Sequence, residues 1–327
     1  MMRPRAATTA LCVIAFLSAS SNDAAAQPSY PTKPVRMIVP FAPGGGTDIT
    51  GRLVAHKLSE IWNVPIVIDN RPGAGSTIGE DMVSKAARDG YTLGVTSMSH
   101  AINATLYRTL PYETMRDFAF IILTVRVPNV LVVHPAVPAR STKELVALAK
   151  SQPGRLNFSS SGVGGVSHLA AEVFCATAGI EMTHVPYKGA GPAMTALVSG
   201  EAQVMMATIP VLLPQMKANR VRPLAISSLR RSPLLPELTT IAEAGYQGFE
   251  TDSWFGLFAP AITPTSIVRK VNADANTALQ APDLVSALAQ QGAQPAGGTP
   301  QDFEKFMQAE VAKWRHVIIK SKIPLAN

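Results

Sequence analysis

Cysteine is almost absent from the chain, and its scarcity excludes a fold held together by disulfides. The sequence has 327 residues and two cysteines, Cys12 and Cys175. Cys12 lies in a predicted export signal, so one thiol remains in the mature chain, and one thiol cannot form an internal disulfide. Cys175 stands in the apolar run HLAAEVFCATAG. This setting favours a small buried side chain over a reactive nucleophile, which needs an exposed, electropositive site.

Aromatic residues, clusters of charge and long apolar runs are scarce as well. Aromatic residues make up 6% and charged residues 16% of the chain. The net charge is +7, but the basic residues are scattered and do not alternate with aromatics, so no nucleic-acid partner is expected. No segment after residue 26 reaches the roughly 18 apolar residues of a transmembrane helix, so the mature protein is not expected to span a membrane.

The first 26 residues have the pattern of a secretory signal peptide. Arg3 and Arg5 precede the apolar run TALCVIAFL, and alanines at 24–26 form a cleavage site. The sequence therefore predicts an exported protein whose mature chain starts at Gln27. A retained anchor is the alternative, but the apolar run is too short to cross a bilayer.

Apolar runs of strand length alternate with helical patterns along most of the chain. This alternation favours an α/β fold with mainly parallel sheets, and the length is sufficient for two lobes. Ser141 with Glu144, Thr263–Pro264 and Thr299–Pro300 mark predicted helix starts. The predicted strands are VRMIVPF, VPIVIDN, YTLGVTS, VLVVHP, RLNFSSS, AQVMMAT, VRPLAIS and SWFGLFAP.

One kind of segment occurs twice in the sequence. FAPGGGTDITGRL begins at Phe41 and FSSSGVGGVSHLA begins at Phe158. Each has the pattern of a strand end, a glycine-rich turn and a helix start. The repetition suggests two similar lobes that direct a turn and a helix N-terminus at a shared space. Chance similarity between two such turns is the alternative.

The first glycine-rich turn has the composition of an anion site. Gly44, Gly45 and Gly46 precede Thr47 and Asp48 at a predicted helix start. Glycine lets a partner approach the backbone closely, and a helix N-terminus offers unpaired N–H groups and a partial positive charge. The alternative is a tight turn that Thr47 or Asp48 caps without a ligand.

Two further polar turns follow predicted strands. Turns at the carboxyl ends of strands form the ligand crevice of open α/β sheets, and hydroxyls with free N–H groups suit a carboxylate. A solvated loop with a serine cap is the alternative for the first of these turns. That turn contains Ser159, Ser160, Ser161, Gly162, Gly164, Gly165 and Ser167, and the other, SMSHAIN, begins at Ser97.

Familiar catalytic and cofactor motifs are missing. The first glycine turn lacks the lysine of a P-loop, and in IVIDNRPGAGSTIG the third glycine falls one place late for a dinucleotide fingerprint. There is no Gly-x-Ser-x-Gly or His-Glu-x-x-His motif. His168 and Glu172, one helical turn apart, predict a local ion pair or hydrogen bond rather than half of a metal site. We therefore expect no catalytic residue, no metal and no cofactor.

Long ordered motifs extend from about Tyr30 to Ile319: YPTKPVRMIVPFAPGGGTDI, VIDNRPGAGSTIGEDMVSKAARDGYTLGV, HAINATLY, VPNVLVVHP, HVPYKGAGPAMTALVSGEAQVMM, RSPLLPELTTIAEAGY and SWFGLFAPAITP. These motifs closely resemble the Bug family, the extracytoplasmic solute receptors of tripartite tricarboxylate transporters. The resemblance implies a two-lobed periplasmic binding protein of type II-like fold. It would be a monomer that closes over a small carboxylate and delivers it to the large and small membrane subunits of a transporter.

The resemblance also implies a domain organisation. The chain would cross between lobes near Pro128–Asn129 and again near Asp252–Trp254. After the signal peptide at 1–26, lobe 1 would consist of 27–128 and 253–327, and lobe 2 of 129–252.

In the family, loop N–H groups, hydroxyls and bridging water hold the ligand carboxylate. Carried over to this chain, the implied contacts lie in four turns and on two later segments. They are Phe41, Pro43, Gly44, Gly45, Gly46, Thr47, Asp48, Gly73, Ala74, Gly75, Ser76, Ser97, Ser99, His100, Ser159, Ser160, Ser161, Gly162, Gly164, Ser167, His168, Tyr187, Ala207 and Thr208.

One position departs from the family pattern. Ala207 stands where family members commonly carry an aspartate. Losing that acceptor disfavours a ligand with an ammonium group and favours a plain carboxylate with an apolar or aromatic body near Met205 and Ala207. Two other classes of function stay open as alternatives: an exported α/β enzyme such as a hydrolase, and a sensor that presents its ligand to a membrane kinase.

Overall fold

The structure is a computed structural model that describes residues 1, 30–320, 325 and 326. Residues 2–29, which hold Cys12 and the predicted export signal with its cleavage site, lie outside the described part. Within that part, no helix combines the length and the hydropathy that crossing a membrane requires.

One half of the molecule, which we call lobe 1, is built on a six-stranded sheet of order β11-β4-β10-β3-β1-β2. Helices α1, α8 and α9 pack on one face of this sheet, and α2, α3 and α10 pack on the other. The strands are β1 Val35–Val39, β2 Ile66–Asn70, β3 Thr92–Ser97, β4 Phe118–Val127, β10 Ser253–Pro260 and β11 Gln294–Pro295. The helices are α1 Gly46–Trp62, η1 Ala74–Ser76 (a 3₁₀ turn), α2 Thr77–Ser84, α3 Met98–Leu106, α8 Thr265–Gln280, α9 Pro282–Gln290 and α10 Pro300–Lys320.

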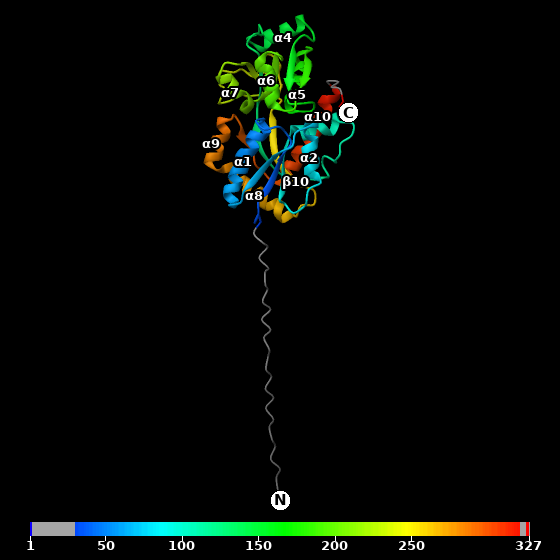
Figure 1. Cartoon of the computed structure of the whole chain (residues 1–327), viewed down its shortest axis with the longest axis vertical. Coiled ribbons are helices and arrows are strands. Elements are labelled where there is room, and N and C mark those ends of the chain that lie inside the picture. The colour runs from blue at the N-terminus through cyan, green and yellow to red at the C-terminus, as the bar shows by residue number, and fades with distance from the viewer. Residues whose placement is uncertain (2–29, 321–324, 327) are drawn as a thin grey trace.

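The other half, lobe 2, is built on a five-stranded sheet of order β7-β6-β8-β5-β9. Helices α4 and α5 cover one face and α6 and α7 the other. Figure 1 shows α4 to α7 gathered at one end of the molecule and α1, α2, α8 and α9 at the other. The strands are β5 Asn129–Val133, β6 Asn157–Ser160, β7 Thr183–Pro186, β8 Val204–Thr208 and β9 Arg222–Ile226, and the helices are α4 Thr142–Ser151, α5 Val166–Ala178, α6 Ala190–Ser199 and α7 Ile209–Lys217.

The expected two-lobed α/β architecture is confirmed, but the expectation of mainly parallel sheets needs correction, because both sheets are mixed. β1 runs parallel to β2 and β3, and β6 runs parallel to β7 and β8. β10 runs antiparallel to β3 and β4, and β5 runs antiparallel to β8 and β9. A strand that is buried on both faces is apolar throughout, so its sequence carries no sign of its direction.

All the predicted strands are present, and three further strands were not predicted. β4, with the sequence FAFIILTVRV, is almost entirely buried. β7 and β11 are short edge strands without a clear apolar pattern. Such edges are recognised only by the neighbour with which they pair.

The predicted helix starts agree with the structure. Ser141 is the N-cap of α4, and its Oγ accepts a hydrogen bond from Glu144 N at 3.2 Å. Thr299 precedes α10, and its Oγ1 accepts from Asp302 N at 3.1 Å. At the start of α8 the Thr263 hydroxyl donates instead to the Pro260 carbonyl at 2.7 Å, so it does not cap the helix.

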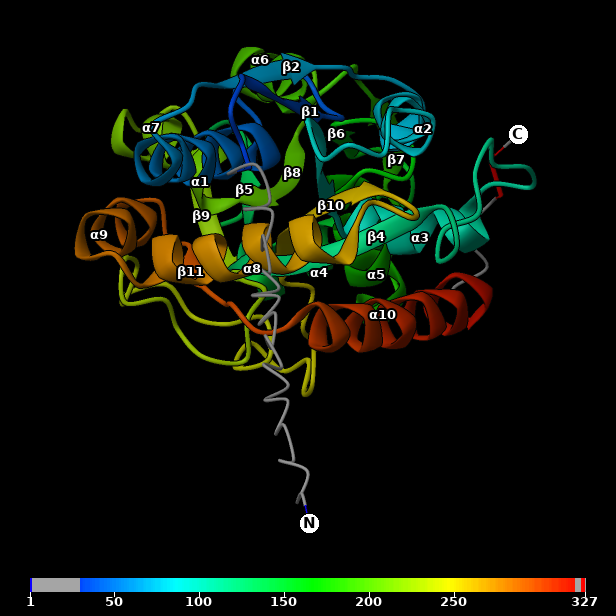
Figure 2. The same ribbon diagram turned by 90° about the horizontal axis from the view of Figure 1, so that it is seen from below.

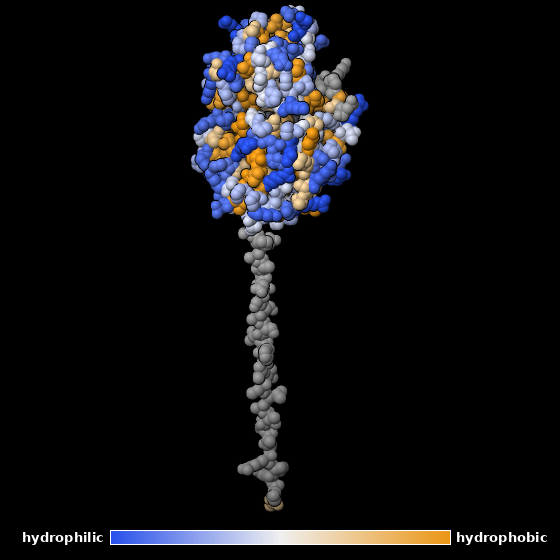
Figure 3. Space-filling model, in the orientation of Figure 1, coloured by the Kyte–Doolittle hydropathy of each residue, from blue (hydrophilic) through white to orange (hydrophobic). Residues whose placement is uncertain are grey.

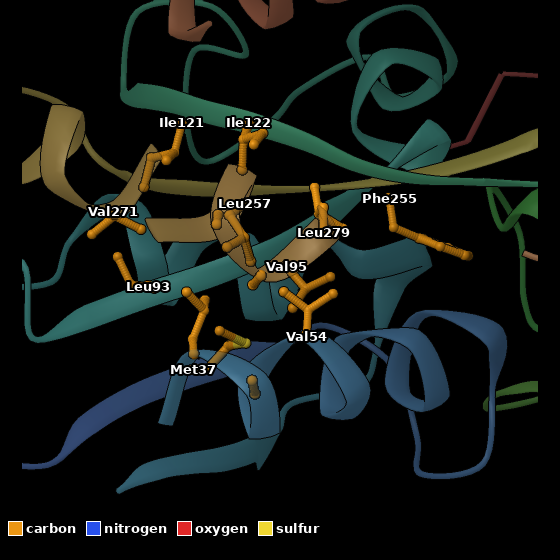
Figure 4. Packing of buried hydrophobic residues seen from close by; sticks show 14 of the residues in the cluster. Met37, Val54, Leu93, Val95, Ile121, Ile122, Phe255, Leu257, Val271 and Leu279 are labelled. Atoms are coloured by element: carbon orange, nitrogen blue, oxygen red, sulfur yellow. The ribbon is translucent and has the colours of Figure 1, made fainter. Parts of the chain in front are cut away.

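The core of lobe 1 lies between α1 and α8 and the central strands. Val54 of α1 and Val271 of α8 meet Met37, Val95 and Leu257 from three neighbouring strands, and each is nearly or fully buried (Figure 4). Seen from below, α1 and α9 lie to the left of the central strands and α2 and α3 lie to the right, on the two faces of the sheet (Figure 2). On the outside, hydrophilic and hydrophobic residues are interspersed over the face that Figure 3 shows.

Two crossovers join the sheets, a short one from β4 to β5 and a long one from β9 to β10. β4 ends at Val127 and β5 begins at Asn129, so Pro128 alone lies between them. The return crossover reaches β10 through Asp252, whose Oδ1 accepts a hydrogen bond from the Ser227 hydroxyl at 2.8 Å. Burial raises the pKa of the Asp252 carboxyl to about 6, although the Ser227 hydrogen bond opposes the shift.

Asp252→Asn is expected to raise the stability of the unliganded protein near neutral pH. Because the pKa of Asp252 rises from 3.8 to about 6 on folding, the folded state retains a proton that the unfolded chain releases. The protonated Asp252 carboxyl therefore makes its full contribution to the stability of the folded state below about pH 4, and this contribution is lost as the pH rises through about 6. The amide keeps an acceptor for Ser227 and removes this loss.

The measurement is the melting temperature from pH 4 to 8, with Asp283→Asn as a control at an exposed ion pair with Lys57. The increase in melting temperature caused by Asp252→Asn should grow between pH 4 and 7, and the control Asp283→Asn should not raise the melting temperature. An equal effect of Asp252→Asn at pH 4 and pH 8 would contradict this account.

Candidate ligand-binding site

Four helices begin around one small cavity between the lobes. The cavity has a volume of about 40 Å³ and is lined by residues at the starts of α1, α5, α6 and α7. A helix N-terminus carries unpaired N–H groups and about half a positive charge. Four such ends directed at one space make it favourable for an anion.

These helix starts make no side-chain caps of their own. The N-cap residues are Gly45, Gly165, Gly189 and Thr208, and none forms a side-chain capping hydrogen bond. A serine or aspartate at an N-cap would accept a hydrogen bond from one of the first N–H groups. Ile209 N of α7 donates to the Pro128 carbonyl at 3.3 Å, and Pro192 of α6 and Pro210 of α7 have no N–H. The remaining donors of the first turns are left to a ligand or to water.

Thr208 adds an unpaired hydroxyl to the cavity wall. The residue is 6% exposed, and its Oγ1 has no hydrogen-bond partner among the described residues. A buried hydroxyl without a partner is unfavourable by about 1–3 kcal/mol, so a polar ligand atom or a water is expected beside it. The other polar residues that line the cavity are Thr47, Asn129, Ser161 and Ser167.

The three consecutive glycines have three different roles. Gly44 has a φ of +82°, and its N–H donates to Asp48 Oδ2 at 3.0 Å. Gly45 is the N-cap of α1. A Cβ at Gly46 would overlap Thr208 Oγ1 of lobe 2. The first glycine therefore shapes the turn, and the third lets the two lobes touch.

Asp48 holds the turn and does not face the cavity. Its carboxylate accepts hydrogen bonds from Gly44 N, from Arg52 Nε at 2.9 Å and from Asn70 Nδ2 at 2.9 Å. Burial alone would raise the pKa of Asp48, but the hydrogen bonds from Arg52, Gly44 and Asn70 outweigh it and lower the pKa. The ionised carboxylate thus fixes the turn to the end of β2.

A larger cavity of about 700 Å³ adjoins the small one, since Phe41 and Ser161 line both. Lobe 1 contributes Tyr107 and the turn at 73–76, in which Ala74 and Ser76 adopt positive φ values of 43° and 94°. Such φ values are unfavourable for residues other than glycine and occur often at functional sites. From lobe 2 come Ser161, Gly162, Val163, His168, Glu172, His184, Tyr187, Lys188 and Gly189.

Two stacked imidazoles form part of the wall of the larger cavity. The rings of His168 and His184 are 3.9 Å apart and nearly parallel. Burial, and next the neighbouring His168, lower the pKa of His184 to about 3, so its ring is neutral at ordinary pH. Gly164 N donates to His168 Nδ1 at 3.2 Å, and Nε2 of the same ring lies 3.6 Å from Glu172 Oε1. The predicted local His168–Glu172 pair is confirmed.

A serine and a histidine also lie within hydrogen-bond distance, a pair that the sequence analysis missed. Ser160 Oγ is 2.6 Å from His184 Nε2. Ser160 is fully buried and its hydroxyl also contacts Gly162, so it offers no accessible nucleophile. The thiol of Cys175 is buried as expected, and burial raises its pKa to about 12.

Most of the residues proposed from the sequence line one of the two cavities. Gly73, Ala74, Gly75, Ser76, Gly162, His168 and Tyr187 line the larger cavity. Gly45, Gly46, Thr47, Ser167, Ala207 and Thr208 line the smaller one, and Phe41 and Ser161 line both.

The remaining proposed residues lie elsewhere. Pro43 and Gly44 are on the outside of the turn, and Ser159, Ser160, Gly164 and Asp48 lie behind the cavity walls. Ser97, Ser99 and His100 are fully buried in lobe 1. His100 Nδ1 is 2.9 Å from Glu80 Oε2, and its Nε2 is 2.9 Å from the Thr114 carbonyl. Both ring nitrogens are occupied, so this histidine packs in the core.

Five polar residues line a cavity although the sequence did not point to them as ligand contacts. Asn129 lines the small cavity, and Tyr107, Glu172, His184 and Lys188 line the large one. None of them lies in the four turns from which the site was predicted. Asn129 stands next to the expected crossover, and that position was the available hint.

Comparisons with known proteins by sequence and by structure indicate the same family. The family profile described as "Tripartite tricarboxylate transporter family receptor", TctC, matches residues 50–323. The chain is similar to Rpa4515 of R. palustris, solved with adipate, at 39% identity and a TM-score of 0.88, covering 90% of this chain and 99% of that one. It is also similar to the periplasmic binding protein BugD, at 31% identity and a TM-score of 0.87 over 90% and 99% of the two chains. MatC from Rhodopseudomonas palustris, solved with bound malate, has 32% identity and a TM-score of 0.84 over 88% and 100%.

Gly45→Val is expected to abolish ligand binding while leaving the fold intact. Gly45 has a φ of −80°, which any residue adopts, and a Cβ there would lie 3.6 Å from Ala190 Cβ of lobe 2. A single methyl therefore fits at an ordinary contact distance, whereas the two γ-methyls of valine would fill the space between the starts of α1 and α6.

Gly45→Ala is the matched control. Circular dichroism and thermal unfolding should show that both variants are folded. Titration with carboxylates should show a strong loss of affinity for the valine variant and a mild loss of affinity for the alanine variant. Unfolding of the valine variant would mean that the glycine serves the conformation of the turn instead.

Proposed function

The chain belongs to the TctC family of tripartite tricarboxylate transporter receptors, and from that premise we propose that it binds a small carboxylate in the periplasm and delivers it to a membrane transporter. The predicted export signal supports the periplasmic location. The partners are the large and small membrane subunits that the family implies. The receptor acts as a monomer, since it must close around its ligand.

The observation that carries this proposal is the set of four uncapped helix N-termini around the small cavity, with the unpaired Thr208 hydroxyl among them. N–H groups and a hydroxyl are the donors that an ionised carboxylate accepts. Solved relatives with adipate and malate support the same class of ligand. The carboxylate is held without a lysine or arginine at its head.

The two cavities divide the ligand into a head and a body. A volume of about 40 Å³ has room for a carboxylate group, and the adjoining 700 Å³ has room for the rest of the molecule. The wall of the small cavity includes Met205, Ala207 and Phe255, which suit an apolar carbon next to the carboxylate. With alanine at 207, no carboxylate stands there to pair with an ammonium.

We assign the two lobes to 27–128 with 253–327 and to 129–252. They are closed in this arrangement, because glycines of one lobe lie against the other. A Cβ at Gly75 would overlap the Val163 carbonyl, and one at Gly189 would lie 2.7 Å from Ala42 Cβ. Closure of the lobes would enclose the ligand and exclude water from the carboxylate.

The same geometry argues against the alternative of a hydrolase. Ser160 lies behind the cavity wall although its partner His184 lines the larger cavity, and no carboxylate is hydrogen-bonded to His184 Nδ1 in the described part of the chain. A serine nucleophile needs access to the substrate and an oriented base. A sensor that presents its ligand to a kinase would use the same binding site, so the genomic neighbourhood distinguishes it from a transport receptor.

A thermal-shift screen of the mature chain, Gln27 to Asn327, tests the proposal. The panel contains aliphatic dicarboxylates, tricarboxylates, aromatic carboxylates, aspartate, glutamate and nicotinamide nucleotides. A carboxylate at about 100 times its Kd should stabilise by roughly 2.7 kcal/mol, which is a shift of several degrees. Aspartate and glutamate should shift the protein less than acids without an ammonium group. A flat response of the folded, ligand-free protein to every carboxylate would contradict the proposal.

Thr208→Val is expected to weaken binding of the best carboxylate about tenfold, because the isosteric change removes one donor to the anion. Thr96→Val is the matched control. Thr96 is also buried, and its Oγ1 also has no partner among the described residues, but it lies in β3 away from both cavities. Calorimetric titration should show a loss for Thr208→Val alone. Equal losses for both variants would exclude a direct role for Thr208.

A further inference from the structure

The two crossovers meet at a buried asparagine. Asn129 is the first residue of β5 and is fully buried. Its backbone pairs with lobe 2, since Ser227 N donates to the Asn129 carbonyl at 2.8 Å and Asn129 N donates to Ser227 Oγ at 2.8 Å. These bonds attach the first crossover to the end of β9.

The side chain of Asn129 pairs with the other crossover. Its Nδ2 donates to the Thr251 carbonyl, and its Oδ1 accepts from Ser253 Oγ at 3.0 Å. Ser253 is the first residue of β10 and pairs with Val127 of β4 in lobe 1. One residue therefore bonds to lobe 2 through its backbone and to the strand entering lobe 1 through its amide.

The side chain of Asn129 bridges a break in the backbone hydrogen-bond ladder between the two crossovers. Pro128, between β4 and β5, has no N–H and cannot extend the pairing of β4 with β10. The carboxamide of Asn129 has the same donor and acceptor as a peptide group. It continues the ladder where the backbone stops, and a side chain can turn about its own bonds while the backbone torsions of the crossovers change.

Asn129 also faces the ligand cavity. It lines the small cavity, and in the pairing of β5 with β8 it stands opposite Thr208, which carries the unpaired hydroxyl. Ser227 and Ser253 do not line either cavity. The asparagine is thus the point of the hinge that a ligand can touch.

We propose that the Asn129 carboxamide is the pivot that holds the two crossovers together as the lobes rotate and that links ligand occupancy to the hinge. The inference rests on the proposed receptor function for its ligand-linked part. Asn129 acts as a positioning residue. Without its amide the crossovers separate, the lobes sample a wider range of orientations, and binding weakens because fewer molecules are poised to close.

The test compares Asn129→Ala and Ser253→Ala with Asn272→Ala. The side chain of Asn272 is hydrogen-bonded as well: its Nδ2 donates to the carbonyls of Ile121 at 2.8 Å and Gly298 at 2.9 Å, and both lie within lobe 1. Ser253→Ala removes a bond to the pivot without altering a cavity wall, so it separates a hinge effect from the loss of a ligand contact. Ser253→Ala also tests the proposal if Asn129→Ala folds poorly.

Spin labels report the distance between the lobes. Lys85→Cys at the end of α2 and Lys150→Cys on α4 place labels on exposed sites of lobes 1 and 2. The native Cys175 is buried and does not compete for label. In the ligand-free protein, Asn129→Ala and Ser253→Ala should broaden the distance distribution, and Asn272→Ala should leave it as in the unsubstituted chain.

Titration with adipate is the second readout. Ser253→Ala should raise the Kd for adipate by about fivefold or more, whereas Asn272→Ala should change it by less than about twofold. Unchanged distances in both hinge variants, or equal broadening in all three, would overturn the proposal. Broadening confined to the hinge variants supports the pivot even if adipate fails to bind the unsubstituted protein, and that failure would count against the proposed ligand class.

Discussion

The convergence of four helix N-termini on one small space is the constraint on which the rest of the structure depends. Each end carries a partial positive charge, and such ends repel one another when they are brought together without an anion. The cavity between them is about 40 Å³ in volume, so the repulsion acts at short range. An anionic group at this point would offset the repulsion, so a bound carboxylate would favour the arrangement in which the four ends converge.

Small residues at the helix starts follow from the same constraint. Gly45, Gly165 and Gly189 are N-caps without side chains, so the N–H groups behind them stay uncapped. Gly46 and Gly189 also let the lobes approach to contact distance. A polar side chain at an N-cap would compete with the ligand for the N–H groups, and any side chain at Gly46 or Gly189 would hold the lobes apart. Asp48, by contrast, carries a charge, but its carboxylate stabilises the turn by accepting hydrogen bonds from Arg52 and Asn70.

The two crossovers between the sheets impose a second set of requirements, and these explain why polar groups are buried there. Antiparallel pairing of β4 with β10 and of β5 with β9 brings the two crossovers side by side. Asn129, Ser227, Asp252 and Ser253 form a hydrogen-bonded chain across them. Burial of the Asp252 carboxyl is unfavourable for its charged form, as its raised pKa shows, so this group does not maximise stability near neutral pH. A buried polar network instead specifies one arrangement of the two strands.

The sequence by itself determined the α/β class, the positions of most strands and helix starts, and the glycine-rich turns that line the two cavities, because these follow from local periodicity and from the backbone freedom of glycine. It also determined that Cys175 is a buried thiol. Only the tertiary structure decided which polar residues reach the cleft. His100 and Asn129 are both fully buried and polar, yet His100 lies in the core of lobe 1 and Asn129 lines the cavity. Strand direction, edge pairing and the approach of one lobe to the other depend on contacts between residues far apart in the chain, and no local pattern records those contacts.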